Sequence, residues 1–212
     1  MRKQVQGPIR DKQKTRQKIL NSVGEIVINK GFTHLKISAV ATHAGVDKKL
    51  IYQYFGSFDD LIDEYLLSRD CWTKVYEEDS IPDNNISTKN LIKNILHSQS
   101  EALLNNKELQ KIILWEVSEY HPLLRQCADR REEKGGDLFK KLVDPKFGEN
   151  AKLFRGIMAL LLAGNYYLNI HDVANGSLFC GLDIKKERDR DTLREAVNFI
   201  IDAAFKEKTI EE

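Results

Sequence analysis

This chain of 212 residues contains few of the residues and patterns that mark strands, disulfides or catalytic sites. It has four prolines, three cysteines, no internal repeat and no useful run of alternating apolar and polar residues. A glycine-rich phosphate loop, GxSxG, HExxH and CxxC are all absent. We therefore expect a helical protein that is not an enzyme and that holds no cofactor and no metal ion.

The cysteines and the N-terminus indicate the cellular compartment in which the protein works. Cys71, Cys127 and Cys180 are odd in number and far apart, as is typical of reduced thiols in a cytosol. We interpret them as buried structural residues, with a redox sensor as the alternative. The N-terminus is charged where a secretion signal would be apolar, and the apolar segment Phe154–Leu168 is too short to cross a membrane. These features predict a cytoplasmic protein with no membrane partner.

The net charge of +1 hides a polarised distribution. Residues 1–55 carry 11 Lys and Arg against three acidic residues, a balance of +8, and the remainder balances at −7. A basic first quarter on an acidic body is typical of a nucleic-acid-binding module joined to a region with another task. Residues 1 to about 11 are interpreted as a flexible basic arm that follows the DNA backbone or enters the minor groove. A disordered tail kept soluble by its charge is the alternative.

Residues 37–61 have the pattern of two short helices joined by a tight glycine turn. The first helix has one apolar face, made of Ile37, Val40, Ala41 and Ala44. Gly45 suits the left-handed end of that helix, and Asp47 is a good N-cap for the next. This arrangement predicts a helix-turn-helix.

The second of these helices is expected to bury one face and expose the other. Ile51 and Phe55 share the inward face. The outward face carries Lys48, Lys49, Tyr52 and Gln53. Such a basic, aromatic and amide-bearing face suits a helix in the major groove, where lysines neutralise phosphates and an amide pairs with base edges. A solvated helical corner that touches no DNA is the alternative.

The segment Thr15–Leu66 resembles the N-terminal domain of the TetR/AcrR family of bacterial transcriptional regulators. The positions that match at the family's spacing are Arg16, Ile19, Leu20, Gly31, Phe32, Val40, Ala41, Ala44, Gly45, Val46, Leu50, Ile51, Tyr52, Phe55, Ser57 and Leu61. Two positions depart from the pattern: Lys36 replaces the usual Thr or Ser, and Phe58 replaces the usual Lys. Phe58 fits core packing, so the family's lysine contact is not assigned to it.

The resemblance implies which residues approach DNA. They are Lys36, Ser38, Lys48, Lys49, Leu50, Tyr52, Gln53 and Tyr54. Lys48 and Lys49 would meet phosphates or base edges, and Tyr52 would donate its hydroxyl to a phosphate. Tyr54 has two interpretations, as a second phosphate contact or as a half-buried side chain.

The rest of the chain is expected to form a larger helical domain. We predict a DNA-binding domain over residues 1–57 and an effector-binding and dimerisation domain over residues 58–212, giving an all-α fold. The expected helices cover 58–78, 88–105, 108–119, 121–143, 149–171 and 188–206. A polar break at 80–85, a loop at Pro145 and Gly148, and a connector over 172–187 separate some of them.

The last two helices are expected to join two copies of the chain. The resemblance implies a four-helix homodimer interface, and the small residues Gly156, Ala159, Ala163 and Gly164 permit close approach. Ordinary packing within one chain is the alternative for these residues. A symmetric dimer reads two half-sites about one helical turn apart, so double-stranded DNA with a palindromic operator is the expected partner.

The resemblance also implies a pocket for an unknown small-molecule effector. The candidate lining residues are Trp72, Leu96, Leu103, Ile113, Trp115, Phe139, Met158 and Tyr166, each of which has plain core packing as its alternative. A bound effector would pull on the helix over 58–78 and separate the two recognition helices. The expected function is a dimeric, ligand-responsive repressor. There are two alternatives: a helical adaptor, and a recombinase-like enzyme that uses the helix-turn-helix only for docking.

Overall fold

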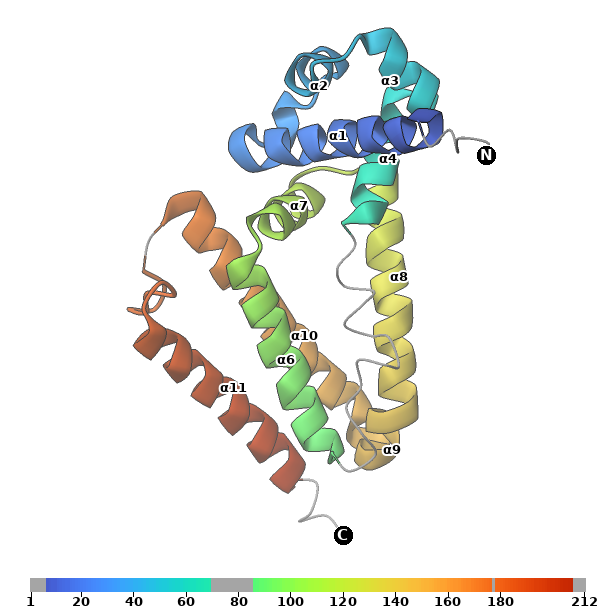
Figure 1. The fold of residues 1–212 in the computed structure, drawn as a ribbon. Coiled ribbons are helices and arrows are strands. Elements are labelled where there is room, and N and C mark those ends of the chain that lie inside the picture. The colour runs from blue at the N-terminus through green and yellow to red at the C-terminus, as the bar shows by residue number, and fades with distance from the viewer. Residues whose placement is uncertain (1–6, 70–85, 177, 208–212) are drawn as a thin grey trace, which may run out of the picture.

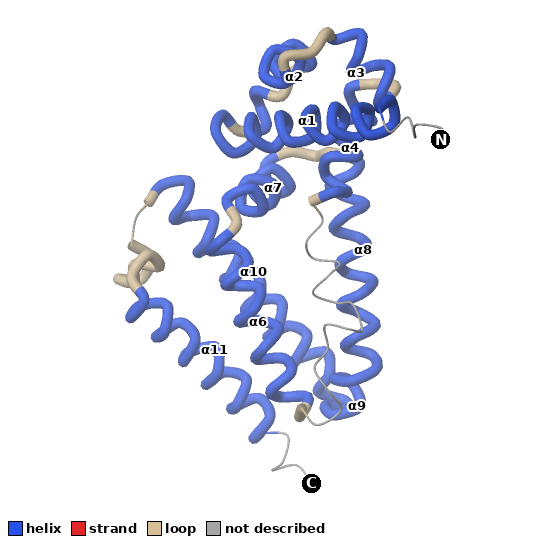
Figure 2. Tube along the Cα trace, in the orientation of Figure 1, coloured by secondary structure: helices blue, strands red, loops and turns tan. Residues whose placement is uncertain are grey.

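The computed structural model describes residues 7–69, 86–176 and 178–207. Helices dominate these residues, and the described part has no strand beyond an isolated bridge between Phe179 and Leu182. The N-terminal helices are α1 (Gly7–Lys30), α2 (Ile37–Ala44), α3 (Lys48–Phe55) and α4 (Phe58–Ser68). The later helices are α6 (Thr88–Asn105), α7 (Lys107–Ser118), α8 (Pro122–Leu138), α9 (Asp144–Phe147), α10 (Ala151–Asn175) and α11 (Glu187–Glu207). The predicted all-α class is confirmed (Figures 1 and 2).

The helix-turn-helix forms as its local residues predict. Gly45 ends α2 in the left-handed conformation with φ 60°, which an L side chain rarely adopts. The carboxylate of Asp47 accepts a hydrogen bond from the backbone N–H of Lys49 at 2.7 Å and caps α3. Ser57 and Asp60 form a reciprocal capping box at the start of α4. These caps hold α3 at a defined angle to its neighbours.

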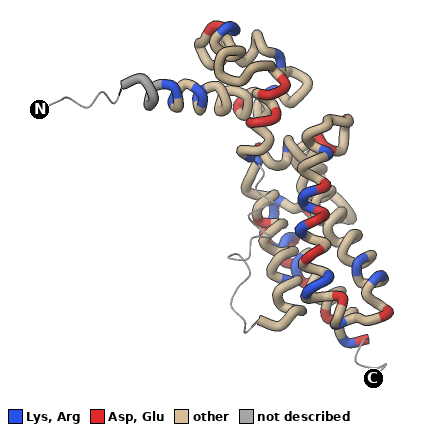
Figure 3. Tube along the Cα trace, turned by 90° about the vertical axis from the view of Figure 1, so that its right-hand side faces the viewer, with Lys and Arg blue, Asp and Glu red and all other residues tan. Residues whose placement is uncertain are grey.

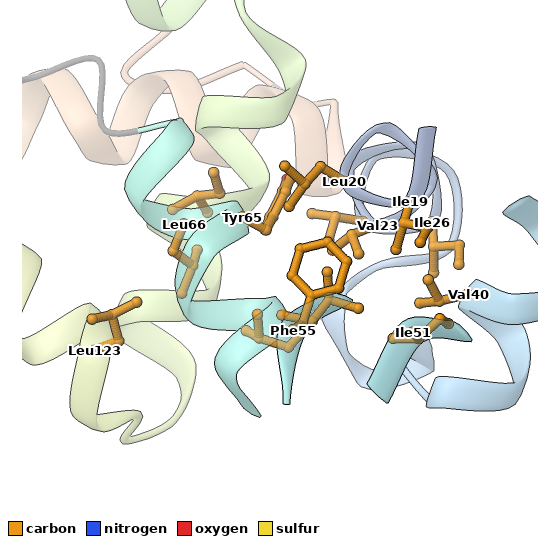
Figure 4. Packing of buried hydrophobic residues seen from close by; sticks show 14 of the residues in the cluster. Ile19, Leu20, Val23, Ile26, Val40, Ile51, Phe55, Tyr65, Leu66 and Leu123 are labelled. Carbon is orange, nitrogen blue, oxygen red and sulfur yellow. The ribbon is translucent and has the colours of Figure 1, made fainter. Parts of the chain in front are cut away.

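A hydrophobic cluster fastens α1, α2, α3 and α4 together (Figure 4). Ile19 and Val23 of α1 meet Val40 of α2, Ile51 of α3 and Tyr65 of α4, and all five side chains are buried. The cluster continues into later helices through Ile112, Trp115, Leu123, Leu124 and Cys127. The N-terminal helices are therefore packed against α7 and α8 as well as against one another.

The later helices contain two smaller clusters. One joins α6, α9, α10 and α11 around Phe147, Phe154 and Ile201. The other joins α6 and α7 to α10 around Leu103 and Ile113. At the outer edge, α11 is docked on α6 by polar pairs: Lys89 and Lys93 with Asp202, His97 with Asn198, and Glu101 with Arg194. No helix within the described ranges is both long and apolar enough to span a lipid bilayer.

Several predicted boundaries need correction. Helix α1 begins at Gly7, so residues 7–11 are helical and do not belong to a flexible arm. Pro8 is compatible with this because the first turn of a helix makes no use of the missing N–H. Pro145 likewise lies in the first turn of α9, where a loop was predicted. Helix α10 continues past residue 171 until Gly176 ends it in the left-handed conformation, which shortens the connector.

Other predictions are confirmed or lie outside the described residues. Helix α6 covers the predicted 88–105, and the helix predicted over 121–143 is α8 followed by a π-helical turn at Phe139–Val143. The described part of α4 ends at Ser68. The remainder of the helix predicted to residue 78, the polar break at 80–85, and residues 1–6 of the predicted arm lie outside the described residues.

Candidate nucleic-acid interface and ligand cavity

Helix α3 separates its side chains into a buried and an exposed face. Ile51 is fully buried and Phe55 nearly so. Tyr52 is 48% exposed, and Lys48, Lys49 and Gln53 are also exposed. The two lysines make no ion pair within the described ranges, so their charges face solvent. This is the arrangement required of a helix that presents cations, a hydroxyl and an amide to a polyanion.

The other predicted contacts lie at the start of α2 and beside the exposed face of α3. Lys36 and Ser38 are exposed. Leu50 and Tyr54 are half-buried, and Tyr54 packs against the hydrophobic cluster. Its side chain is thus half-buried, and its contact with a phosphate stays a prediction. Helices α2 and α3 lie on the side of α1 that faces away from α6, α10 and α11 (Figure 1).

Arg16 of α1 holds the C-terminal end of α3 in place. Its Nη1 donates a hydrogen bond to the Tyr54 carbonyl at 2.9 Å, and its Nε donates to the Glu64 carboxylate of α4 at 2.6 Å. The guanidinium also lies over the Phe55 ring, 4.7 Å from the ring centre. One side chain thus joins α1, α3 and α4. The sequence pattern placed Arg16 in the first helix, but this positioning role depends on Glu64, 48 residues away, and has no local signal.

Basic residues follow one another along α1 toward its N-terminal end (Figure 3). Lys12, Gln13 and Lys14 are exposed. The described N-terminal region therefore presents positive charge on α1 as well as on α3, in agreement with the polarised charge of the sequence.

Comparison with protein families matches residues 24–65 to the family described as "Bacterial regulatory proteins, tetR family". The match covers the end of α1 from Gly24, all of α2 and α3, and most of α4. Helices α1 to α4, within which this match lies, are called the tetR-family domain below. No curated protein matches the chain.

Solved structures share the fold over most of the chain. NalD of Pseudomonas aeruginosa, a secondary repressor of the MexAB-OprM multidrug efflux pump, is 20% identical, with a TM-score of 0.61, over 92% of this chain and 96% of NalD. FadR from Bacillus subtilis, solved in complex with stearoyl-CoA, is 16% identical, with a TM-score of 0.59, over 87% of this chain and 96% of FadR. A TetR-like transcriptional regulator from Rhodococcus sp. RHA1 is 12% identical, with a TM-score of 0.58, over 93% of this chain and 97% of the regulator. The helices that follow the tetR-family domain therefore also have the fold of such regulators.

Helix α7 contacts the tetR-family domain directly. Glu108 accepts hydrogen bonds from the Tyr65 hydroxyl at 2.8 Å and from Arg69 at 3.1 Å, both on or next to α4. Burial, followed by the Glu108 charge, raises the pKa of Tyr65 well above its ordinary value, so the hydroxyl stays protonated as the donor. Trp115 stacks on Phe32 with ring centres 5.3 Å apart. A movement of α7 would therefore displace both α4 and the turn at Phe32 that follows α1.

A cavity of about 200 Å³ lies between α6, α10 and α11. Its apolar lining comprises Leu96, Leu160, Leu161, Gly164, Leu168, Ile184, Leu193, Ala196, Val197 and Ile200. Arg190 also lines it, and its Nη1 donates to the backbone carbonyls of Ile184 and Lys185. Its Nε has no hydrogen-bond partner among the described residues. Arg194 and Glu101, which pair with each other, also line the cavity, as do the polar side chains of His97, Ser100 and Asn165. The cavity thus combines apolar walls with the guanidinium of Arg190 and a paired arginine and glutamate.

The predicted effector-binding residues are distributed over several places. Leu96 lines the cavity. Leu103, Ile113 and Tyr166 pack in one cluster, Phe139 and Met158 in another, and Trp115 in the junction with the tetR-family domain. Trp72 lies outside the described residues. The structure does not bring this set together, because helical periodicity identifies an inward face without showing which inward side chains meet a void. Leu193 and Val197, which also line the cavity, lie on α11, a helix that the sequence analysis assigned to the dimer interface.

Helices α10 and α11 also expose apolar side chains. Leu153, Leu160 and Tyr167 follow one another at seven-residue intervals on α10, with Gly156 and Ala163 exposed between them. Phe199 and Ile200 are exposed on α11. Leu160 is 76% and Phe199 75% accessible. Large apolar side chains arranged in a stripe mark a surface that a partner covers.

Proposed function

We propose that the protein is a dimeric, ligand-responsive transcriptional repressor that binds a palindromic operator in double-stranded DNA. The observation that carries the proposal is the exposed face of α3, whose Lys48, Lys49, Tyr52 and Gln53 project from a helix that is capped, clamped and buried on its other side. A rigidly held helix loses little entropy on entering the major groove. The likeness to NalD, which is described as a repressor, supports repression.

The proposed dimer forms through α10 and α11. The stripe of Leu153, Leu160 and Tyr167 supplies apolar area, and the exposed glycine and alanine between these side chains allow two helices to approach closely. In a two-fold symmetric interface the same stripe meets its own copy. Two copies of α3 would then read half-sites about one helical turn apart, which a single short helix cannot do.

The proposed effector site is the cavity between α6, α10 and α11. Its apolar walls and the unpartnered Nε of Arg190 favour a ligand with an apolar body and an acidic group. FadR, a structure of similar fold, was solved with an acyl-CoA, which is an apolar chain on an anionic carrier. Leu160 and Ile200 belong both to the cavity lining and to the exposed apolar face, so a bound ligand would alter the surface proposed to form the dimer.

A movement caused by a ligand in the cavity would reach the DNA-binding helices through α6 and α7. Helix α11 is docked on α6, and α6 leads through Asn106 into α7. Helix α7 in turn contacts Phe32, just after α1, through Trp115 and contacts α4 through Glu108. A ligand that separates α11 from α10 would shift these helices and change the spacing of the recognition helices. A difference in ligand affinity of about 1 to 3 kcal/mol between free and DNA-bound protein would be ordinary coupling. The site of action would be the cytoplasm, where the chromosome lies.

The deciding experiment selects bound DNA from a random-sequence duplex library and repeats the binding over a series of salt concentrations. We expect a partly palindromic site and a steep loss of affinity with salt, since lysines displace counterions from the phosphates. Binding without a preferred sequence would favour the helical adaptor instead. Strand cleavage in the presence of magnesium would favour the recombinase-like enzyme.

A further inference from the structure

A cleft of about 590 Å³ separates the N-terminal half of α1 from α3. It is lined by Lys12, Gln13 and Arg16 of α1 and by Leu50, Gln53 and Tyr54 of α3. None of the described side chains that line it is acidic, and its Lys12, Gln13 and Gln53 are all exposed. The cleft therefore opens beside the face of α3 proposed to read bases, and its walls carry groups that donate hydrogen bonds to an anion.

The width of this cleft is set by Arg16. Its hydrogen bonds to the Tyr54 carbonyl and to Glu64, together with its position over the Phe55 ring, tie α1 to the end of α3. Lys12 lies one helical turn before Arg16, so both side chains leave α1 on the same side. The clamp thus presents Lys12 toward α3 before any partner arrives.

The two basic residues of the cleft have different tasks. The charge of Arg16 is balanced by its ion pair with Glu64. Lys12 has no ion pair within the described part of the chain, so its charge is available to a partner. Lys14, which is also exposed, follows two residues later and leaves α1 about 200° around the helix from Lys12. Only one of these two lysines faces the cleft.

We propose that the cleft between α1 and α3 seats one strand of the DNA backbone, with Lys12 binding a phosphate and the amides of Gln13 and Gln53 donating hydrogen bonds beside it. This inference rests on the proposed DNA binding and adds a second element, α1, to the contact surface. The seated strand borders the groove that α3 enters. Because phosphates carry no sequence information, the contact fixes the register and tilt of α3 and leaves base preference to the exposed face of α3.

The test compares Lys12→Ala with Lys14→Ala. Both variants remove one positive charge from an exposed position on the same helix, so they change the net charge equally and neither disturbs the core. The probe is the duplex recovered from the library selection, and the dissociation constant is measured by fluorescence anisotropy over a series of KCl concentrations. Lys12→Arg, which retains the charge, is the third variant.

We expect Lys12→Ala to weaken binding of the dimer at least about tenfold and to lower the slope of log K against log salt by about two, because one charged phosphate contact is lost in each half-site. Lys14→Ala should weaken binding by no more than about twofold, because a charge outside the contact is screened. Lys12→Arg should bind almost as the unaltered protein does. Equal losses for the two alanine variants would overturn the inference while leaving the proposed function standing.

Ethylation interference locates the contact independently. We expect one phosphate in each half-site whose ethylation weakens binding of the unaltered protein but makes no difference to Lys12→Ala. An identical interference pattern for the two proteins would overturn the assignment of Lys12. If the unaltered protein binds no DNA at all, the proposed function fails together with this inference.

Discussion

The tetR-family domain buries its large apolar side chains, whereas the region formed by α10 and α11 leaves several of them exposed. In the first, the large aliphatic side chains of α1 to α3 converge on one cluster and the outward face of α3 is polar. In the second, large apolar side chains such as Leu160 and Phe199 remain three-quarters exposed. A surface that meets a polyanion needs cations and donors, whereas a surface that meets another protein gains from apolar area. The contrast is the one that the proposed DNA-binding face and the proposed dimer surface require.

The boundary between the two regions is less sharp than their surfaces. The cluster around Ile19 and Ile51 includes Ile112 and Trp115 of α7 and Leu124 of α8. The short helices of the tetR-family domain thus use the later helices to complete their core. A domain that shares its core with the later helices can be affected by them through packing alone.

Truncating the core of the first region should have the largest effect on stability. Ile51 is fully buried, and Ile51→Ala should lower the free energy of unfolding by about 2 to 5 kcal/mol, because it leaves a cavity beneath α3. Urea unfolding followed by circular dichroism measures the change. Gln53→Ala on the exposed face of the same helix is the control and should leave the unfolding midpoint almost unchanged. Similar losses for both would contradict the proposed division of α3 into two faces.

A negative charge introduced on the exposed face of α11 should weaken the proposed dimer. We expect Phe199→Glu to weaken the dimer by about 2 kcal/mol or more, since a buried carboxylate would face its own copy across the two-fold axis. Analytical ultracentrifugation gives the dimer dissociation constant. Val117 is an equally exposed apolar residue outside α10 and α11, so Val117→Glu is the control. Unchanged dimerisation of Phe199→Glu would move the interface elsewhere.

The junction between the regions can be tested through Gly24. A Cβ at this position would lie 2.3 Å from the Glu108 Oε1, so Gly24→Ala must displace a carboxylate that is bonded to Tyr65 and Arg69. We expect a net destabilisation of about 1 to 2 kcal/mol. In a Glu108→Ala background the same change should stabilise by up to about 1 kcal/mol, because alanine favours the helix. A double-mutant cycle in urea measures the coupling, and additive effects would refute the contact.

Lowering the pH should have the smallest of these effects, a weaker docking of α11. The hydrogen bonds from Lys93 at 2.7 Å and Lys89 at 3.0 Å hold the pKa of Asp202 below its ordinary value. A carboxyl whose pKa is lower in the folded state stabilises above its unfolded pKa, and this contribution is lost as pH falls through the folded pKa. We therefore expect a slight weakening of α11 docking on acidification, seen as faster amide hydrogen exchange in α11. Asp202→Asn should show less of this pH dependence.

The helices and caps could be predicted from the sequence because their causes are local. Gly45, Asp47 and Ser57 act on residues within one turn, and the apolar period of α6 is contained in its own 18 residues. The exposed face of α3 follows in the same way from helical spacing. Its role in DNA binding stays a prediction until the binding experiments are done. The start of α1 was misjudged because Gly7 and Pro8 suggest a break, although both are tolerated in a first helical turn.

By itself the sequence determined the all-α class, the helix-turn-helix and the separation of positive charge from the later helices, since all three depend on neighbours in the chain. The tertiary structure decided which inward residues are core and which line the cavity, because that depends on how α6, α10 and α11 fit together. It also decided the roles of Arg16 and Glu108, whose partners lie about 40 or more residues away in the chain. A pattern of spacing identifies the face of a helix, but only the packed chain shows what that face meets.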